Sequence, residues 1–161
     1  MSKKKRKIEP PEEEHNACVI PAKTVLPLKL WDFLTDRGRN VILEWVKDDK
    51  ISVRDRARLN QKLERLCQMD FDAAIHTKLL AGPIAKTKHV YKLRIHGDVM
   101  LRPLLCRGPI NNTAEYTLLA GAVEIGDKLP DAAVNAAAEN RNTVIGNPER
   151  RCSHVRIPSK S

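Results

Sequence analysis

The sequence predicts an α+β domain, in which a small antiparallel sheet is combined with an N-terminal helix pair and a C-terminal helix. The first observation is an apolar/polar alternation of period two in Tyr91–Ile95, followed by a second strand-like segment at Val99–Leu105. Gly97-Asp98 lies between them and suits a two-residue hairpin turn, because glycine accepts the positive φ that such turns require. The second observation is a helical apolar period in Arg54–Met69.

The segment Arg54–Met69 is predicted to be an amphipathic helix on which the hairpin packs. Ser52 is a good N-cap, and Asp55 stands at the third helical position, as in a capping box. Leucines and Cys67 recur at helical spacing along one face. The outer face carries four cations that we expect to attract RNA by long-range charge: Arg54, Arg58, Lys62 and Arg65.

The remaining elements follow from shorter signals. Residues 25–30 are predicted to form a first strand, confined to a sheet edge by Pro27. Residues 33–46 are predicted to be helical toward their end, and residues 115–123 to be a third strand of the hairpin's sheet. A final helix is predicted to begin at Pro130 and to end at Gly146.

Charge divides the chain into a domain and two tails. We expect residues 1–17 to be a disordered charged tail, 18–146 the folded domain, and 147–161 a flexible C-terminal tail. The net charge is +9, and residues 1–14 hold five cations and four acids, so most of the excess lies in the domain. Such a balance favours RNA, DNA or an acidic protein as partner. The Lys3–Lys7 run also suits a nuclear-import signal, although a solubilising tail explains it as well.

Several classes of protein are disfavoured. No apolar run approaches the ~20 residues of a membrane span, and no apolar stretch follows the basic N-terminus as in a secretory signal. The four cysteines are scattered and none forms a closely spaced pair, so we expect reduced thiols, no metal and no cofactor. The sequence therefore predicts a soluble cytoplasmic protein that has no contact with membranes.

The order and spacing of the motifs resemble the RelE/ParE superfamily of toxins from type II toxin–antitoxin systems, in particular its phage-derived HigB-like branch. The similarity extends over roughly residues 25–150. It is carried by Phe33-Leu-x-x-Arg37-Gly-Arg-x-Val-Ile42, Arg58-Leu-x-x-Lys-Leu-x-x-Leu66, Lys78-Leu-Leu, Tyr91-Lys-Leu-Arg94, Arg102-Pro-Leu, Thr117-Leu-Leu-Ala-Gly-Ala and Gly126-Asp-Lys128.

The resemblance implies a compact toxin that a cognate antitoxin neutralises. Many members cleave mRNA on the ribosome, whereas ParE-type members inhibit DNA gyrase. Carried over by position, Lys92 matches a lysine used in proton transfer and Arg102 matches an arginine that clamps phosphate. Arg94 occupies a position common across the superfamily, where a role in the site and a role in the scaffold are equally open. Lys128 is the nearest cation to the basic segment that follows the third strand in the ribonucleases.

This sequence also departs from the ribonucleases of the superfamily. Val123-Glu124-Ile125 stands where those enzymes carry basic residues, and the last predicted helix contains no tyrosine. The HigB-like branch uses a late histidine, for which His154 is the candidate here, and it falls in the expected tail. His96 beside the hairpin turn is an alternative base, because the unperturbed pKa of histidine is near 6.5.

We therefore expect a ribosome-dependent mRNA endoribonuclease toxin whose partners are an antitoxin, the ribosome and mRNA. Its expected catalytic residues are Lys92 and Arg102, assisted by Arg94 or His96. The alternative is a non-catalytic protein of the same fold, either a gyrase inhibitor or an orphan or phage accessory binding protein.

Overall fold

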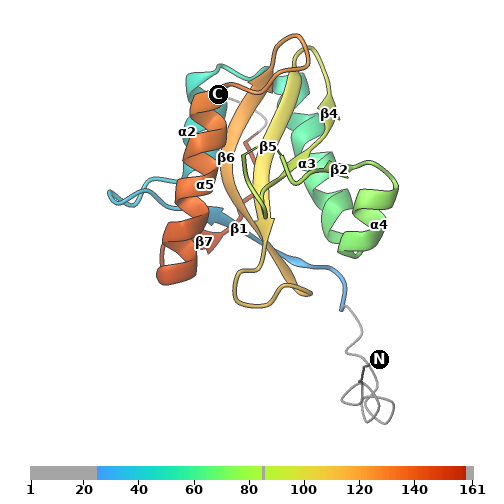
Figure 1. Ribbon diagram of the computed structural model, residues 1–161. Helices are drawn as coiled ribbons and strands as arrows, with labels where there is room; N and C mark the ends of the chain where they lie inside the picture. The colour runs from blue at the N-terminus through green and yellow to red at the C-terminus, as the bar shows by residue number, and fades with distance from the viewer. Residues whose placement is uncertain (1–24, 85, 159–161) are drawn as a thin grey trace, which may run out of the picture.

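A computed structural model describes residues 25–84 and 86–158, which form an α+β structure around a mixed sheet (Figure 1). Predictions for residues 1–17, for Lys3–Lys7 and for Cys18 lie outside the described residues. The elements follow one another as β1 (Lys29–Phe33), α2 (Val41–Asp48), α3 (Val53–Cys67), α4 (Phe71–His76), β2 (Leu80–Ala81), β3 (Tyr91–Leu93), β4 (Ile95–His96), β5 (Met100–Arg107), β6 (Glu115–Glu124), α5 (Asp131–Gly146) and β7 (Arg151–Ser153).

The sheet is larger than predicted and is not purely antiparallel. Its strand order is β2-β3-β5-β6-β1-β7, and β4 also pairs with β5. β1 lies parallel to β6, with Lys29 opposite Glu115, whereas the other pairs are antiparallel. β1 is therefore an inner strand. The prediction of an edge strand is wrong because β7, from the C-terminal end of the chain, covers its outer side.

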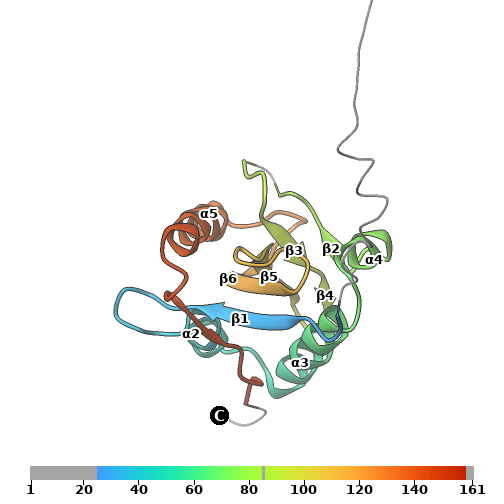
Figure 2. The ribbon, with the colours of Figure 1, turned by 90° about the horizontal axis from the view of Figure 1, so that it is seen from below.

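Helices cover both faces of the sheet, as Figure 2 shows with α5 on one side and the α2–α3 pair on the other. The larger core joins α2 and α3 to the apolar side chains of β1, β3, β5 and β6. The smaller core lies under α5, where Val134 and Ala137 pack near Leu104 and Ala120. Gly121 of β6 allows α2 to approach, because a Cβ there would lie 1.9 Å from the Trp45 ring. None of the described helices is long and apolar enough to cross a membrane.

The central hairpin is confirmed, but its connection differs from the prediction. His96 pairs with Met100, so three residues, Gly97–Val99, join β4 to β5. Gly97 does not adopt a positive φ. Its lack of a side chain matters instead, because a Cβ would lie 2.2 Å from Asp55 Oδ1. Asp55 accepts hydrogen bonds from the Asp98 and Val99 backbone N–H groups at 3.0 and 3.3 Å, which fixes the turn against α3.

The predicted helices agree with α2, α3 and α5 of the structure to within about two residues where a boundary was given. Ser52 Oγ accepts from the Asp55 backbone N–H at 3.1 Å, as an N-cap should. The segment 33–46, predicted to be helical toward its end, begins as strand and loop and becomes helical at Val41, as predicted. Asn40 sets that start, because its Oδ1 atom accepts from the backbone N–H groups of Ile42 and Leu43.

The predicted flexible tail at 147–161 is wrong for residues 147–158, which belong to the fold. β7 pairs with β1, and the His154 backbone N–H donates to the Leu30 carbonyl at 2.9 Å. Ile157 is buried, and its backbone exchanges two hydrogen bonds with the Asn60 side chain, at 2.8 and 3.0 Å. These contacts join residues about a hundred positions apart, so no local sequence pattern could predict them.

Candidate functional site

Two residues expected to be catalytic, Lys92 and Arg102, form a network with Glu124 on the face of the sheet that α5 covers. Glu124 accepts from Lys92 Nζ at 2.5 Å and from Arg102 Nε at 2.8 Å. Arg102 also donates through Nη1 to the carbonyl groups of Ile95 and Leu101 at 3.1 and 2.8 Å. Arg102 is only 3% exposed and Glu124 only 8%. Arg102, expected to clamp phosphate, is therefore a buried side chain whose Nε and Nη1 donors already have acceptors within the fold.

The sheet register explains why these residues meet. Met100 pairs with Glu124 and Arg102 with Ala122, so the carboxylate lies diagonally across from the guanidinium on the same face. Lys92 pairs with Leu104 on the adjacent strand and reaches the same carboxylate. Burial alone would raise the pKa of Glu124, but the Lys92 hydrogen bond and the Arg102 charge hold it below its usual value. Glu124 is thus an anion at neutral pH and pairs with both predicted catalytic cations.

A pH dependence of stability follows from this network. A carboxylate with a lowered pKa in the fold stabilises the protein above its unfolded pKa, and this contribution is lost as the pH falls through the folded value. We expect Glu124→Gln to be most destabilising, relative to wild type, at neutral pH, and the difference to shrink below about pH 4. Urea unfolding from pH 7 to pH 3 measures this, with exposed Glu139→Gln as control. A difference that is constant over this range would contradict the assignment.

A cavity of about 580 Å³ opens above the network and brings together lysines from three segments. Lys92, expected to be catalytic, and Lys128, expected to bind RNA, both line it. Lys86, which the sequence analysis did not select, lines it as well. Two acids, Asp127 and Asp131, also face this space, so the cavity is mixed in charge.

The other predicted catalytic residues lie elsewhere on the hairpin. Arg94 is half-buried between β3 and β4, where its backbone N–H donates to the Leu79 carbonyl at 2.9 Å. His96 is exposed and stands opposite Met100. Neither lines the cavity above Glu124. The structure therefore brings Lys92, Arg102 and Lys128 to one region but does not add a histidine to it.

The predicted basic face of α3 is partly neutralised. Arg58 Nη1 donates to Asp55 at 2.6 Å and also approaches Asp98 at 3.4 Å. Arg54 lies 3.6 Å from the same Asp98 carboxylate. Burial would raise the pKa of Asp55, but its backbone hydrogen bonds and Arg58 lower it. Only Lys62 and Arg65 of the predicted set have no ion pair within the described residues.

A second candidate site contains His154, the late histidine that the sequence analysis set aside because it falls in the expected tail. His154 Nδ1 lies 2.8 Å from Oδ1 of Asp32, whose side chain is fully buried. Asn40 Nδ2 donates to the other carboxylate oxygen at 2.8 Å, and this bond fixes the carboxylate. An ionised carboxylate can only accept, so Nδ1 donates to Asp32, and Nε2 has no hydrogen-bond partner within the described residues. A histidine oriented in this way by a carboxylate is a common general base.

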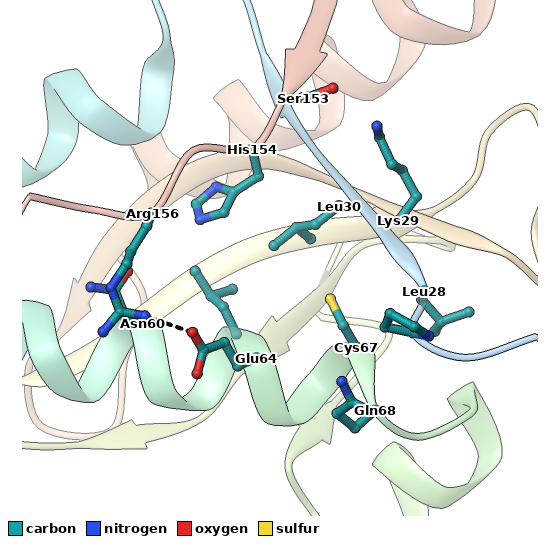
Figure 3. A pocket seen from close by; sticks show the side chains of 12 residues that line it. Leu28, Lys29, Leu30, Asn60, Glu64, Cys67, Gln68, Ser153, His154 and Arg156 are labelled. Carbon is teal, nitrogen blue, oxygen red and sulfur yellow. Dashed lines mark hydrogen bonds and ion pairs between the residues drawn. The ribbon is translucent and has the colours of Figure 1, made fainter.

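His154 lines a cavity of about 350 Å³ between β1, α3 and the C-terminal segment, which we call the His154 cavity (Figure 3). Leu28, Leu30 and Leu63 supply its apolar wall. Its polar rim includes Lys29 and the Glu64–Arg156 ion pair, in which Nη1 and Oε2 are 2.6 Å apart. Cys67 also lines it, but burial raises the pKa of this thiol to about 11, so it is a poor nucleophile.

The sequence contained one signal for this site that was not used. Asp32 interrupts the apolar segment Leu30-Trp31-Asp32-Phe33, and a carboxylate inside a strand needs a partner when it is buried. Its partner, however, is 122 positions away. Within residues 25–84 and 86–158, no cluster of three or more histidine, cysteine or acidic side chains could hold a metal ion.

Comparison with known proteins returned no match: no family model, curated protein or solved structure is significantly similar to this chain. The resemblance to RelE/ParE toxins therefore stays a prediction from the sequence motifs.

Proposed function

We propose that the protein is a toxin of a type II toxin–antitoxin system that cleaves mRNA on the ribosome, and that His154 is its general base. The single observation that carries the catalytic part is the buried Asp32 carboxylate 2.8 Å from Nδ1 of His154, a residue that lines the His154 cavity. This arrangement differs from the set expected from the sequence, in which Lys92 and Arg102 led the chemistry.

The proposed reaction is attack of a ribose 2′-hydroxyl on the adjacent phosphate. His154 Nε2 takes the hydroxyl proton, the 2′ oxygen bonds to phosphorus, and the bond from phosphorus to the 5′ oxygen breaks. The leaving oxygen takes its proton from water, because the Lys29 side chain points away from the His154 ring and its Nζ lies 4.8 Å from the centre of the Trp31 ring (Figure 3). The products are a 2′,3′-cyclic phosphate and a 5′-hydroxyl end. A ribosome that positions the mRNA lets such a modest set of groups suffice.

Binding of a polyanion is supported by charge. The net charge of +9 attracts RNA over long range, and the effect weakens as salt rises. Lys86, Lys92 and Lys128 add local cations above the Glu124 network, although Asp127 and Asp131 line the same cavity. In this proposal these lysines bind the RNA backbone, and the buried Arg102–Glu124 pair holds the strands that carry them.

The decisive test is induced expression in bacteria, followed by mapping of new mRNA 5′ ends. Cleavage that depends on translation and yields 5′-hydroxyl ends supports the proposal. Arrest of growth with intact mRNA and gyrase-dependent DNA breaks supports the non-catalytic alternative. One observation favours that alternative: Glu124 neutralises Lys92 and Arg102, which were the leading catalytic residues in the sequence.

A further inference from the structure

A second, smaller cavity lies beside the His154 cavity and contains a buried hydroxyl group without a partner. We call it the Tyr116 cavity; it has a volume of about 140 Å³, and Leu28 lines both cavities. Tyr116 of β6 is 1% exposed, and its hydroxyl makes no hydrogen bond within the described residues. A buried polar atom without a partner costs free energy, so such an atom at a cavity wall points to a ligand that completes it.

Tyr116 lines the cavity together with Arg107, Asp70 and Asp72. Burial raises the pKa of this phenol, and the charges of Arg107 and of two aspartates, all of which line the cavity, act on it. Tyr116 stands directly opposite Arg107 in the β5–β6 register. The hydroxyl can donate or accept, and thus serves either kind of ligand atom.

Arg107 supplies a planar wall with donors. Its guanidinium lies 4.2 Å from the centre of the Phe71 ring, which holds the plane in place. Nε donates to the Asn112 carbonyl at 3.1 Å, whereas its two terminal amino groups have no hydrogen-bond partner in the described part of the chain. A guanidinium held in this way can donate two in-plane hydrogen bonds to the edge of a nucleobase.

Carboxylates supply the acceptors. Asp70 caps α4 through Oδ1, which accepts from the Ala73 backbone N–H at 2.8 Å. Asp72 is exposed and makes no ion pair within the described residues. A ligand that offers N–H groups on one edge and oxygen or nitrogen acceptors on another therefore matches this cavity.

We infer that the Tyr116 cavity binds a guanine base of the RNA substrate, with Asp72 accepting from the N1 and N2 hydrogens and Arg107 donating to O6 and N7. The cavity is smaller than those that enclose drug-sized ligands, and it suits one planar base without its sugar. Because Leu28 is shared, the sugar and phosphate of that nucleotide would lead toward Lys29 and His154. The inference rests on the proposed RNA chemistry and adds a sequence preference to it.

The test is binding of the full chain to guanosine, adenosine, cytidine and uridine 3′-monophosphates, and to the trinucleotides ApGpA and ApApA. We expect guanosine monophosphate to bind at least about 10-fold more tightly than the others, as one well-paired base contact provides. ApGpA should bind more tightly still, because RNA supplies further phosphates. Equal affinity for all four monophosphates would overturn the inference. ApGpA binding no tighter than guanosine monophosphate would overturn its RNA part and leave a site for free nucleotide.

Single substitutions distinguish an effect on guanine binding from effects on folding and on RNA cleavage. Asp72→Asn should abolish the guanine preference, whereas Asp36→Asn, an equal charge change at an exposed loop residue, should keep it. Tyr116→Phe should weaken guanine binding without lowering the melting temperature, because the hydroxyl has no partner to lose. His154→Gln should bind guanine normally even if no variant cleaves RNA, so failure of the proposed function would not hide the result. A preference that survives Asp72→Asn would contradict the assignment.

Discussion

His154→Gln is expected to reduce mRNA cleavage by about 10²–10⁴-fold, the usual contribution of a positioned general base. Glutamine can still donate an N–H to the buried Asp32 carboxylate, so β7 should remain paired with β1. It has no basic nitrogen, however, and cannot accept the 2′-hydroxyl proton. The measurement is the rate of cleavage of a ribosome-bound mRNA by purified protein, together with thermal melting of the same sample.

The matched control is His96→Gln, which makes the same change in an exposed histidine of the hairpin. It should cleave at the wild-type rate. Asp32→Asn supplies a second readout, because an amide in place of the carboxylate disturbs the ring orientation and changes the pH dependence of the rate. Normal cleavage by a folded His154→Gln protein, or loss of cleavage on changing His96, would exclude the proposed centre.

What could be predicted from the sequence was the structure that short-range patterns specify. The α3 helix follows from its N-cap Ser52 and its apolar period, and both signals lie within the helix or beside it. The hairpin follows from alternation on the two sides of Gly97. The parallel pairing of β1 with β6 brings Lys29 next to Glu115, and no local signal encodes such a contact. The sheet was therefore predicted as smaller and antiparallel.

The candidate site shows the same limit in its chemistry. The residue types of a phosphate-binding set were present in the hairpin, but their exposure depended on Glu124, which the sequence analysis treated only as a departure from a family pattern. His154 was set aside because the last residues read as a charged tail. The fixed orientation of the His154 side chain depends on Asp32 and Asn40, more than a hundred positions earlier. Sequence reasoning located the charged residues and could not determine which of them neutralise one another.

Glu124→Gln is expected to lower the free energy of unfolding by about 3–5 kcal/mol, because it leaves the Arg102 guanidinium buried without a counter-charge. For a chain of this size that corresponds to a fall of roughly 6–20 °C in melting temperature. Arg102→Ala should also be strongly destabilised, contrary to what an exposed phosphate-binding arginine would show. Loss of activity in that variant would therefore say nothing about catalysis.

Lys92→Gln is the control that separates the effect of the buried Arg102–Glu124 pair from that of the partly exposed Lys92–Glu124 pair. The Lys92 side chain is 24% exposed and contacts the same carboxylate, but Arg102 still neutralises Glu124 when the lysine is lost. This change should cost about 1 kcal/mol, the usual net value of one partly exposed hydrogen-bonded pair. The double variant Arg102→Met with Glu124→Met removes both buried charges, and we expect it to recover much of the stability lost in Glu124→Gln. Urea unfolding of the wild type, Glu124→Gln, Lys92→Gln and the double variant gives the free energies of unfolding. Equal losses for Lys92→Gln and Glu124→Gln would show that water reaches Arg102, and would restore it as a candidate for binding phosphate.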